Sequence, residues 1–463
     1  ADFDKLINSI ENTRGRFLKT TEGGEKIDTD IKAMRMIHNS IMGRPTVPTM
    51  SESGRAIARS IRAYQFSRVM GQVGIAQIPD LFAAAGSFGV RNMMDQLPAL
   101  KGMVTRMADG RLTDDLADEL ENILAPGSDR LLNQPLGRFS DGTQDATAIT
   151  GTDRALHHVN RLVSDVSGMH IIQGTAERWG ARAAAQRIAK QAMGLGGSRK
   201  LSPQRLESMG LTGEWQTRVF DQINAHVGMT EGGITGRRLG TLNLDNWTDV
   251  PARERFIDAL HQWTRKAVQR NDPQDLAMWM HTDIGKFITQ FRTFGFVAWS
   301  KQLQHGVRMH DADSALMAMA GLTGGVLAYS LKASTNSVGR KDQDEYLREN
   351  FTPEKVASGA FYRTNWSSLL PMGIDSALTL VDQDPVFAHG RTTGMANDLL
   401  LGNPSVDAFN TLASAIGGGA KALYDPDEPL TQGTVRELWG LAPFQNSYLG
   451  APLGRMLQNQ APE

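Results

Sequence analysis

Three side chains that could bind a metal ion lie close together at His310, Asp311 and Asp313. An imidazole and two carboxylates at this spacing offer oxygen and nitrogen ligands to one cation. The same residues could instead form a solvated cap at the start of the next helix, and we favour that interpretation. Elsewhere the histidines lack metal-ligand spacing, because there is no His-Glu-x-x-His motif and the adjacent His157 and His158 would diverge on a helix. We therefore expect no metal site.

Catalytic and nucleotide-binding motifs are also missing from the sequence. Gly285 and Lys286 are followed by Phe287, whereas a phosphate-binding loop needs a hydroxyl at that position for its metal ion. The chain has no cysteine, which excludes thiol catalysis, Cys-ligated zinc, iron–sulfur clusters and disulfides. The carboxylates between residues 114 and 121 are more typical of an exposed helix face than of an acid–base pair in a cleft. The sequence predicts a protein that is not an enzyme and holds no cofactor.

Arginines are spaced to form basic stripes on two predicted helices. Because 49 Lys and Arg stand against 50 Asp and Glu, a net charge of −1, any affinity for nucleic acid must come from such local patches. The stripes could contact a DNA backbone, line a DNA channel or lie on anionic lipid, and an ordinary solvated surface is the alternative. The candidate polyanion-facing residues are Arg55, Arg59, Arg62 and Arg68 on the first helix, and Arg178 and Arg182 on the second.

Aromatic residues gather on one face of a helix predicted from Asp283 onward. Phe287, Phe291 and Phe294 recur at i, i+4 and i+7, and Trp299 widens the same face. Nearby basic residues could extend their heads to a membrane surface while their aliphatic stems stay in apolar surroundings. This composition is typical of a helix at a membrane interface, but an ordinary helix packed in a bundle is the interpretation we favour. The basic residues are Lys286, Arg292 and Lys301.

A segment without any charged residue follows, from Ser314 to Leu331. As a helix it would be about 27 Å long, slightly short of the roughly 30 Å hydrocarbon core of a bilayer. Gly321 and Gly325 form a GxxxG step, at which another helix could approach closely in lipid or in protein. A buried bundle helix and a membrane span both fit, with the buried helix slightly favoured. Together with the aromatic helix, the segment is typical of a protein that is soluble first and enters a membrane later.

The spacing of apolar residues predicts helices along nearly the whole chain of 463 residues. Ser202 before Pro203, and Thr352 before Pro353, are typical helix starts. Glycine clusters at 194–197, 231–236 and 417–419 predict breaks. We therefore expect an all-α, elongated protein of several segments with helices interrupted by Gly and Pro. The predicted blocks are 1–150 with the basic helix, 151–270, a membrane-active block at 271–335, and a Gly- and Pro-rich tail at 336–463.

Several segments, in their order along the chain, resemble the large internal virion proteins, or ejection proteins, of short-tailed bacteriophages. The resemblance covers about residues 55–450. The segments are RAIARSIRAYQFSRVMGQVGIAQIPDL at 55–81, SPQRLESMGLTGEW at 202–215, TLNLDNWTDVPARERF at 241–256, FITQFRTFGFVAWSKQL at 287–303, the Arg-to-Asp pattern at 361–375, and LWGLAPFQNSYL at 438–449.

The resemblance implies a structural protein that is stored in the capsid core beside portal or core proteins and is expelled at infection. It would then reassemble, with other ejection proteins, as a ring-shaped homo-oligomer that conducts the phage genomic DNA across the host periplasm and inner membrane. Some members carry a lytic transglycosylase domain, which this sequence lacks. We therefore expect either the C-terminal region of a longer polypeptide, as the missing initial Met suggests, or a non-enzymatic branch of the family.

A rival hypothesis from another class is a soluble helical scaffold or a toxin-like pore former. In that case the 314–331 segment would act as a hydrophobic hairpin without nucleic acid. The two hypotheses differ in what the Arg55 stripe does, because the rival predicts that neutralising it leaves activity intact. An enzyme with an unrecognised site is a further alternative, and turnover of peptidoglycan or nucleotides would support it.

Overall fold

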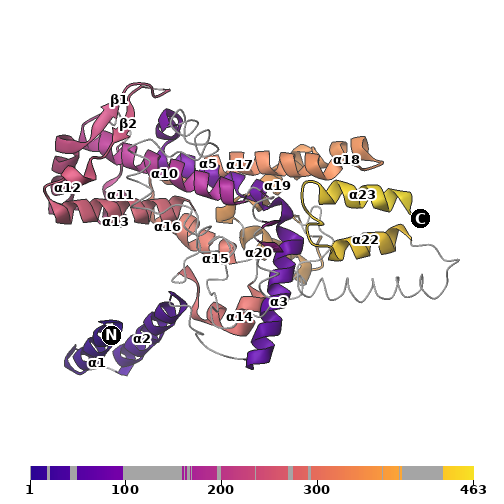
Figure 1. The fold of residues 1–463 in the computed structure, drawn as a ribbon, viewed down its shortest axis with the longest axis horizontal. Helices are drawn as coiled ribbons and strands as arrows, with labels where there is room; N and C mark the ends of the chain where they lie inside the picture. The colour runs from indigo at the N-terminus through magenta and orange to yellow at the C-terminus, as the bar shows by residue number, and fades with distance from the viewer. Residues whose placement is uncertain are drawn as a thin grey trace.

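The computed structural model confirms an all-α protein whose helices are separated at glycines, prolines and short turns. It describes residues 2–17, 21–41, 50–96, 159–160, 162–163, 167, 169–195, 200–234, 236–268, 275–289, 293–367, 369–384, 386–387 and 431–462. Two groups of helices lie at opposite ends of the main body, and helix α5 (Ile78–Phe88) runs between them (Figure 1).

The first group surrounds helix α10 (Met169–Ala192), which is buried on nearly all sides in its second half. Its run of alanines allows neighbouring helices to approach closely, and the core is completed by large side chains such as Phe88, Phe256 and Leu260, all fully buried. Trp263 stacks edge-on against Phe88 and donates a hydrogen bond to Ser87, which ties this group to α5. The surrounding helices are α11 (Pro203–Ser208), α12 (Glu214–His226), the 3-10 turn η2 (Leu244–Asn246) and α13 (Val250–Ala267).

A short antiparallel hairpin lies at the edge of this group, formed by β1 (Gly228–Thr230) and β2 (Arg238–Thr241). The glycine cluster at 231–236, predicted as a break, lies in the connection between the two strands. Its glycines at 232 and 236 have positive φ angles of 98° and 147°, which suit a tight reversal of the chain. The sequence did not predict these strands because they are only three and four residues long.

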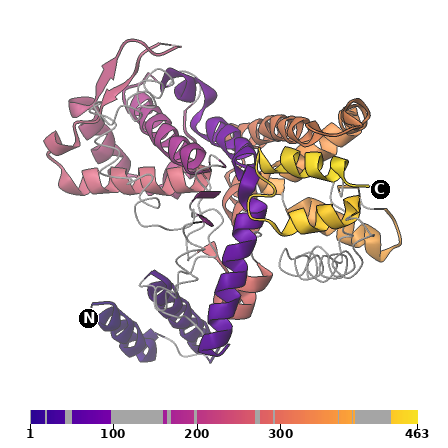
Figure 2. The same cartoon turned by 45° about the vertical axis from the view of Figure 1, so that its right-hand side comes forward.

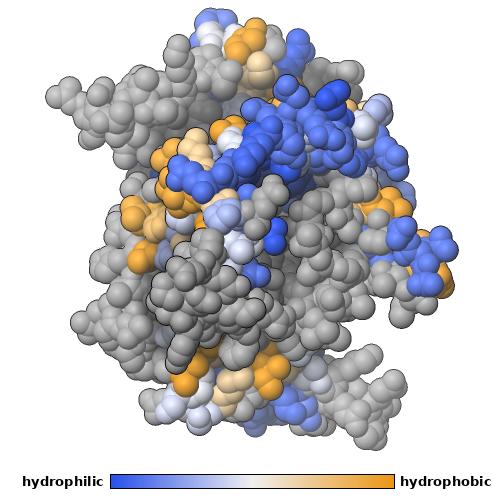
Figure 3. Space-filling model, turned by 90° about the vertical axis from the view of Figure 1, so that its right-hand side faces the viewer, coloured by the Kyte–Doolittle hydropathy of each residue, from blue (hydrophilic) through white to orange (hydrophobic). Residues whose placement is uncertain are grey.

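The second group is centred on α17 (Ala312–Ser337), which packs along α5 and α19 (Pro353–Arg363). Thr352 caps α19 by accepting a hydrogen bond from the Lys355 backbone, and Ser202 caps α11 in the same way, as the sequence predicted. The charged helix α18 (Gln343–Asn350) follows α17, and η6 (Asn365–Ser367) leads to α20 (Leu369–Leu380). Seen from the end of the molecule near α18, hydrophilic side chains form a broad band with hydrophobic patches at its edges (Figure 3).

Helix α3 (Glu52–Val69) leads through η1 (Met70–Gln72) and α4 (Val73–Ala76) into α5. The C-terminal hairpin of α22 (Gln432–Leu441) and α23 (Gly450–Gln460) lies beside α3 (Figure 2). The turn between these two helices bonds to α3, because Phe444 donates its backbone N–H to the Ser67 carbonyl at 3.0 Å. Asn446 likewise donates its side-chain amide to the Val69 carbonyl at 3.2 Å. Near the N-terminus, α1 (Asp2–Phe17) and α2 (Thr21–Ile41) pack against each other.

The segment predicted as one aromatic interfacial helix from Asp283 is divided into shorter elements. Helix α14 ends at Ile288, where the Thr289 hydroxyl donates a hydrogen bond back to the Gly285 carbonyl at 2.8 Å. From Trp299 the backbone adopts π-helical turns, which change the angular spacing of side chains. The common face stays a prediction, because Phe291 and the side chain of Phe287 lie outside the described residues. The elements are η4 (Met278–His281), α14 (Asp283–Ile288), α15 (Thr293–Ala298), the π-helix η5 (Trp299–Gln304) and α16 (His305–Met309).

Residues from all four predicted blocks contact one another in this fold. Helix α5 of the first block packs on α10 of the second and on α17 of the third. Tyr64 of the first block donates its hydroxyl to the Leu441 carbonyl of the last. The blocks therefore share packing surfaces.

Candidate functional site

Helix α17 contains the uncharged segment on which the sequence analysis centred. Asp311 starts the helix, because its carboxylate accepts a hydrogen bond from the Ser314 backbone at 2.9 Å. The helix has 26 residues and no internal proline. It ends at Ser337, and Gly339 follows with a φ of 80°, a left-handed conformation that glycine adopts without strain. The predicted segment 314–331 thus lies wholly inside one long helix.

One face of α17 consists of glycines in direct contact with neighbouring backbones. A Cβ added to Gly324 would lie 2.8 Å from the Cα of Pro79 on α5, and one added to Gly325 would overlap the Ala360 carbonyl of α19. On the opposing helix, a Cβ at Gly86 would lie 2.7 Å from the Cα of Met317. Gly321 is also buried in this crossing. The GxxxG step therefore allows close helix packing, here between helices of the same chain.

The opposite face of α17 is exposed and apolar. Met319 is 64% exposed, which is high for a large apolar side chain in a long helix. Among the described residues, α17 is long and apolar enough to cross a membrane by length and composition, and a third of its most apolar window is buried in the fold. Contiguous exposed apolar surface is typical of a site that contacts another molecule or a membrane. The large exposed apolar residues of α17 are Met319, Val326, Leu327 and Leu331, with Val338 just after the helix, and the exposed polar residues Thr323 and Ser334 lie among them.

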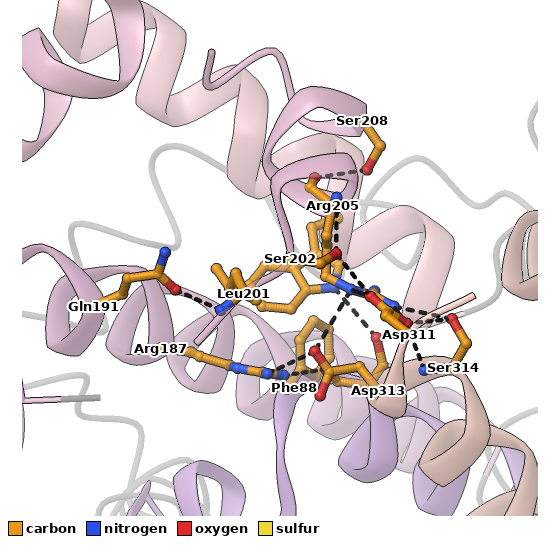
Figure 4. A network of polar contacts seen from close by, with 12 residues as sticks. Phe88, Arg187, Gln191, Leu201, Ser202, Arg205, Ser208, Asp311, Asp313 and Ser314 are labelled. Carbon is orange, nitrogen blue, oxygen red and sulfur yellow. Dashed lines mark hydrogen bonds and ion pairs between the residues drawn. The ribbon is translucent and has the colours of Figure 1, made fainter. Parts of the chain in front are cut away.

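A network of buried ions holds the start of α17 against α10 and α11 (Figure 4). Arg205 donates to both carboxylate oxygens of Asp311, from Nε at 2.8 Å and from Nη2 at 2.9 Å. Arg187 donates from Nη2 to Asp313 at 2.6 Å and from Nη1 to the Ser87 carbonyl of α5 at 2.7 Å. The Nε of Arg205 also lies 3.6 Å from Asp313. We call Arg187, Arg205, Asp311 and Asp313 the charge clasp.

Burial and nearby charges shift the pKa values of Asp311, which belongs to the charge clasp, and of His305, which lies near it. Burial by itself would raise the pKa of Asp311, but hydrogen bonds from Arg205 and Ser314, with the positive charge of Arg205, hold that pKa well below its usual range. Asp311 is therefore ionised at neutral pH. Burial, then the positive charges of Lys266 and Arg205, lowers the pKa of His305 to about 4. His305 is therefore neutral at neutral pH.

The C-terminal end of α17 is held by the C-terminal hairpin. Arg455 of α23 donates to the carbonyls of Asn336 and Thr335 at 2.8 and 3.2 Å. Asn459 donates to the Gly339 carbonyl at 3.0 Å. Lys332 additionally donates to the side chain of Gln72 in η1. A basic side chain at the C-terminus of a helix also complements the helix dipole. Both ends of the apolar helix are thus fixed by polar contacts.

The predicted aromatic face is only partly described, and its basic residues differ from the expectation. Phe294 and Trp299 are half-buried, in α15 and at the start of η5. Phe287 lies in α14, with its side chain outside the description, and Phe291 lies outside the described residues. Lys286 is only 3% exposed, so it does not extend to a surface. Lys301 forms an ion pair with Asp275 instead of presenting a free cation.

The candidate polyanion-facing arginines divide into two groups. Arg55 and Arg62 of α3 and Arg178 of α10 are half-buried, and Arg59 lies in α3 with its side chain outside the description. Arg68 and Arg182 are only 5% and 1% exposed, contrary to the expectation that they face a polyanion. Both lie on helix faces that turn toward the interior, which arginine spacing alone did not reveal.

The possible metal ligands at the start of α17 are engaged in other contacts. Asp311 and Asp313 bind arginines, and His310 points away in an exposed turn with a φ of 46°. The expected cap is present, but it is buried among ions and not solvated as expected. In the part of the chain that the structure describes, no group of three His, Cys, Asp or Glu side chains is arranged for a metal ion.

From the sequence, Arg187 and Arg205 are only further members of the second basic stripe, and their carboxylate partners are not indicated. Their partners lie 126 and 106 residues away in the chain, so no local pattern connects them. The one available signal was the pair of acidic residues just before an uncharged helix.

Comparisons with protein-family models, with curated proteins and with solved structures each find no match to this chain.

Proposed function

We propose that this chain is a structural, non-enzymatic component of a phage DNA-ejection apparatus, in which α17 contacts the lipid of the host inner membrane. The observation that carries the proposal is the exposed apolar face of α17 on a helix with no charge between residues 314 and 331. A helix of this composition loses little on transfer from water to lipid, because no ion has to be desolvated.

The ordered resemblance over residues 55–450 supports the phage assignment, and the all-α fold is compatible with it. In this proposal the protein is stored in the virion interior, with portal or core proteins, and acts in the host periplasm and inner membrane after ejection. It works there with other ejection proteins. A ring of copies is part of the proposal, because a single chain of this size does not easily enclose duplex DNA.

DNA contact in this proposal falls to the half-buried arginines of α3, Arg55 and Arg62, together with Arg59. Arg178 of α10 is the remaining candidate from the second stripe. The burial of Arg68 and Arg182 favours a second candidate function, a helical scaffold or pore-forming protein that contacts membrane without nucleic acid. Binding of the purified chain to duplex DNA separates the two candidates.

Flotation with anionic liposomes, combined with dye release, tests the membrane proposal. The substitutions Met319→Glu and Val326→Glu, made one at a time, each place one charge on the exposed face of α17, where both side chains are exposed in the folded protein. They are expected to abolish both flotation and leakage, because a buried carboxylate in lipid costs about 3 kcal/mol. The matched control is Val307→Glu on α16, which is 58% exposed but lies outside the apolar helix.

Each outcome has a clear meaning. Flotation that the α17 substitutions abolish and the α16 substitution preserves supports the proposal. Flotation that both lose equally assigns the effect to net charge. If the unsubstituted chain does not float, α17 is the core helix of a bundle and the membrane proposal fails.

A further inference from the structure

The charge clasp joins the start of α17 to α10 and α11, which belong to the other group of helices. Its arginines come from α10 and α11, and its carboxylates come from the first residues of α17. All four side chains are buried or nearly so, with exposures of 5% for Arg187, Arg205 and Asp313 and 11% for Asp311. A bidentate arginine–carboxylate pair of this kind fixes geometry as well as charge.

The free energy of such a pair depends strongly on access of water. Removing four ions from water carries a large desolvation cost, so the closed network adds little net stability relative to hydrated, separated ions. Once water enters, each ion is solvated and the attraction falls with the rising dielectric. The network therefore has two favourable arrangements, closed and dry or open and hydrated. This is the behaviour of a latch.

The position of the carboxylates makes the open arrangement compatible with lipid contact. Asp311 and Asp313 lie just before the uncharged segment, and Lys332 lies just after it. When α17 leaves its neighbours, these charges stay at the ends of the segment, where they reach water or headgroups. Opening the clasp therefore carries no ion into the hydrocarbon.

The other described contacts of α17 are helix packing and hydrogen bonds to uncharged groups. Its middle is held by close packing of glycines on α5 and α19, contacts that a second helix or lipid can replace. Trp366 and Thr364 also donate side-chain hydrogen bonds to the Ala318 and Gly321 carbonyls, both at 3.3 Å. Its C-terminal end is held mainly by hydrogen bonds from Arg455 and Asn459 to carbonyl groups, which water can satisfy. Of the described contacts, only the clasp combines several buried ions.

We infer that the charge clasp is a latch that holds α17 in the folded protein, and that separation of Arg187 and Arg205 from Asp313 and Asp311 frees α17 for lipid. The inference rests on the proposed function, because it names the regulation of the same helix. It predicts that weakening the clasp speeds membrane entry, although it also destabilises the fold.

The test measures the initial rate of dye release from phosphatidylglycerol-containing vesicles, with the full chain and with the variants Arg187→Met and Arg205→Met. Each variant removes one cation and leaves its carboxylate partner buried. Hydration of that carboxylate then favours the open arrangement. The expected result is a rate at least tenfold above that of the unsubstituted chain. Asp313→Asn, which removes one charge with little change of shape, is the second variant should an arginine variant fail to fold.

A control breaks another bidentate arginine–carboxylate pair, away from α17 and more exposed than the clasp, with side chains 32% and 22% exposed. Arg218 donates to both oxygens of Asp249 at 2.7 Å, between α12 and the start of α13. Arg218→Met should lower stability without changing the rate of dye release. If it accelerates release as much as the clasp variants do, general destabilisation explains the effect and the latch is overturned.

A reversible disulfide between α17 and α5 tests the same step by preventing it. A Cβ on Gly321 would lie 3.6 Å from the Cβ of Ala83 on α5, which is within the range of a disulfide, and the native chain has no cysteine. The Ala83→Cys, Gly321→Cys chain should release no dye when oxidised and should regain release after reduction. Release by the oxidised chain would overturn the inference.

The outcomes for the latch and for the proposed function are distinct. If the unsubstituted and reduced chains both fail to bind vesicles, the proposed function and the latch fall together. If they bind and leak, but the clasp variants leak at the unsubstituted rate, the latch is overturned and the proposed function stands.

Discussion

Arg205 donates two hydrogen bonds, 2.8 and 2.9 Å long, to Asp311, which lies 106 residues further along the chain. The same carboxylate caps α17, so one side chain both starts the helix and attaches it to α11. The start of the most apolar long helix is therefore fixed by a charged contact. This relationship gives specific expectations for stability.

Asp311→Ala should destabilise the fold by about 3–5 kcal/mol, because it removes a helix cap and leaves the buried Arg205 without its bidentate partner. Thr352→Ala, which removes the cap of α19 at an exposed position, is the control and should cost about 1 kcal/mol. Urea unfolding followed by circular dichroism measures both. Equal losses would mean that the contact with Arg205 contributes nothing beyond capping.

A closely packed glycine in α17 and an unpacked glycine in α20 should respond to substitution in opposite ways. Gly325→Ala should cost about 2–3 kcal/mol, because its Cβ overlaps the Ala360 carbonyl. Gly373→Ala in α20 meets no atom within 4 Å and should stabilise the protein by about 0.5–1 kcal/mol, through helix propensity. Thermal unfolding of the two variants gives the signs. A neutral Gly325→Ala would show that α17 and α19 separate easily.

His305 should make stability depend on pH between about 4 and 6.5. Its pKa is about 4 in the folded protein and 6.5 for an ordinary histidine, so the unfolded chain binds a proton in this range that the folded chain does not. The stability contribution is therefore full above pH 6.5 and falls by about 3 kcal/mol as the pH drops to 4. The variant His305→Gln should lose this part of the pH dependence. An unchanged profile in the variant would assign the slope to other groups.

The DNA part of the proposal concerns the half-buried arginines of α3. Arg55→Gln combined with Arg62→Gln should weaken binding to duplex DNA and reduce the slope of log K against log salt by about 2. The control, Lys341→Gln with Arg348→Gln, removes the same charge from exposed positions near α18. Fluorescence anisotropy at several salt concentrations compares them. Identical slopes for the two double variants would favour the function without nucleic acid.

The sequence predicted the helical class and several helix starts because these depend on local spacing and caps. Ser202, Thr352 and Asp311 each accept the backbone hydrogen bond expected at the start of a helix. Gly321 and Gly325 lie in a close helix crossing, as their spacing indicated. In all these cases the determining residues are within four positions of one another.

The parts that the sequence could not predict depend on contacts between distant residues. Arg68 and Arg182 look like members of basic stripes, but tertiary packing turns them inward. The aromatic helix from Asp283 has an amphipathic spacing, yet Thr289 ends α14 and π-helical turns follow. The clasp partners are separated by more than 100 residues, so no periodicity links Arg187 to Asp313.

The most direct test of the account places a probe on the exposed face of α17. Because the native chain has no cysteine, Met319→Cys can be labelled at a single site with an environment-sensitive fluorophore. We predict a blue shift when vesicles are added, and quenching by brominated lipid, whereas a label at Arg348→Cys on α18 stays in water. If the vesicles bind the protein but the label at position 319 keeps its aqueous spectrum, α17 does not contact lipid and the central claim is contradicted.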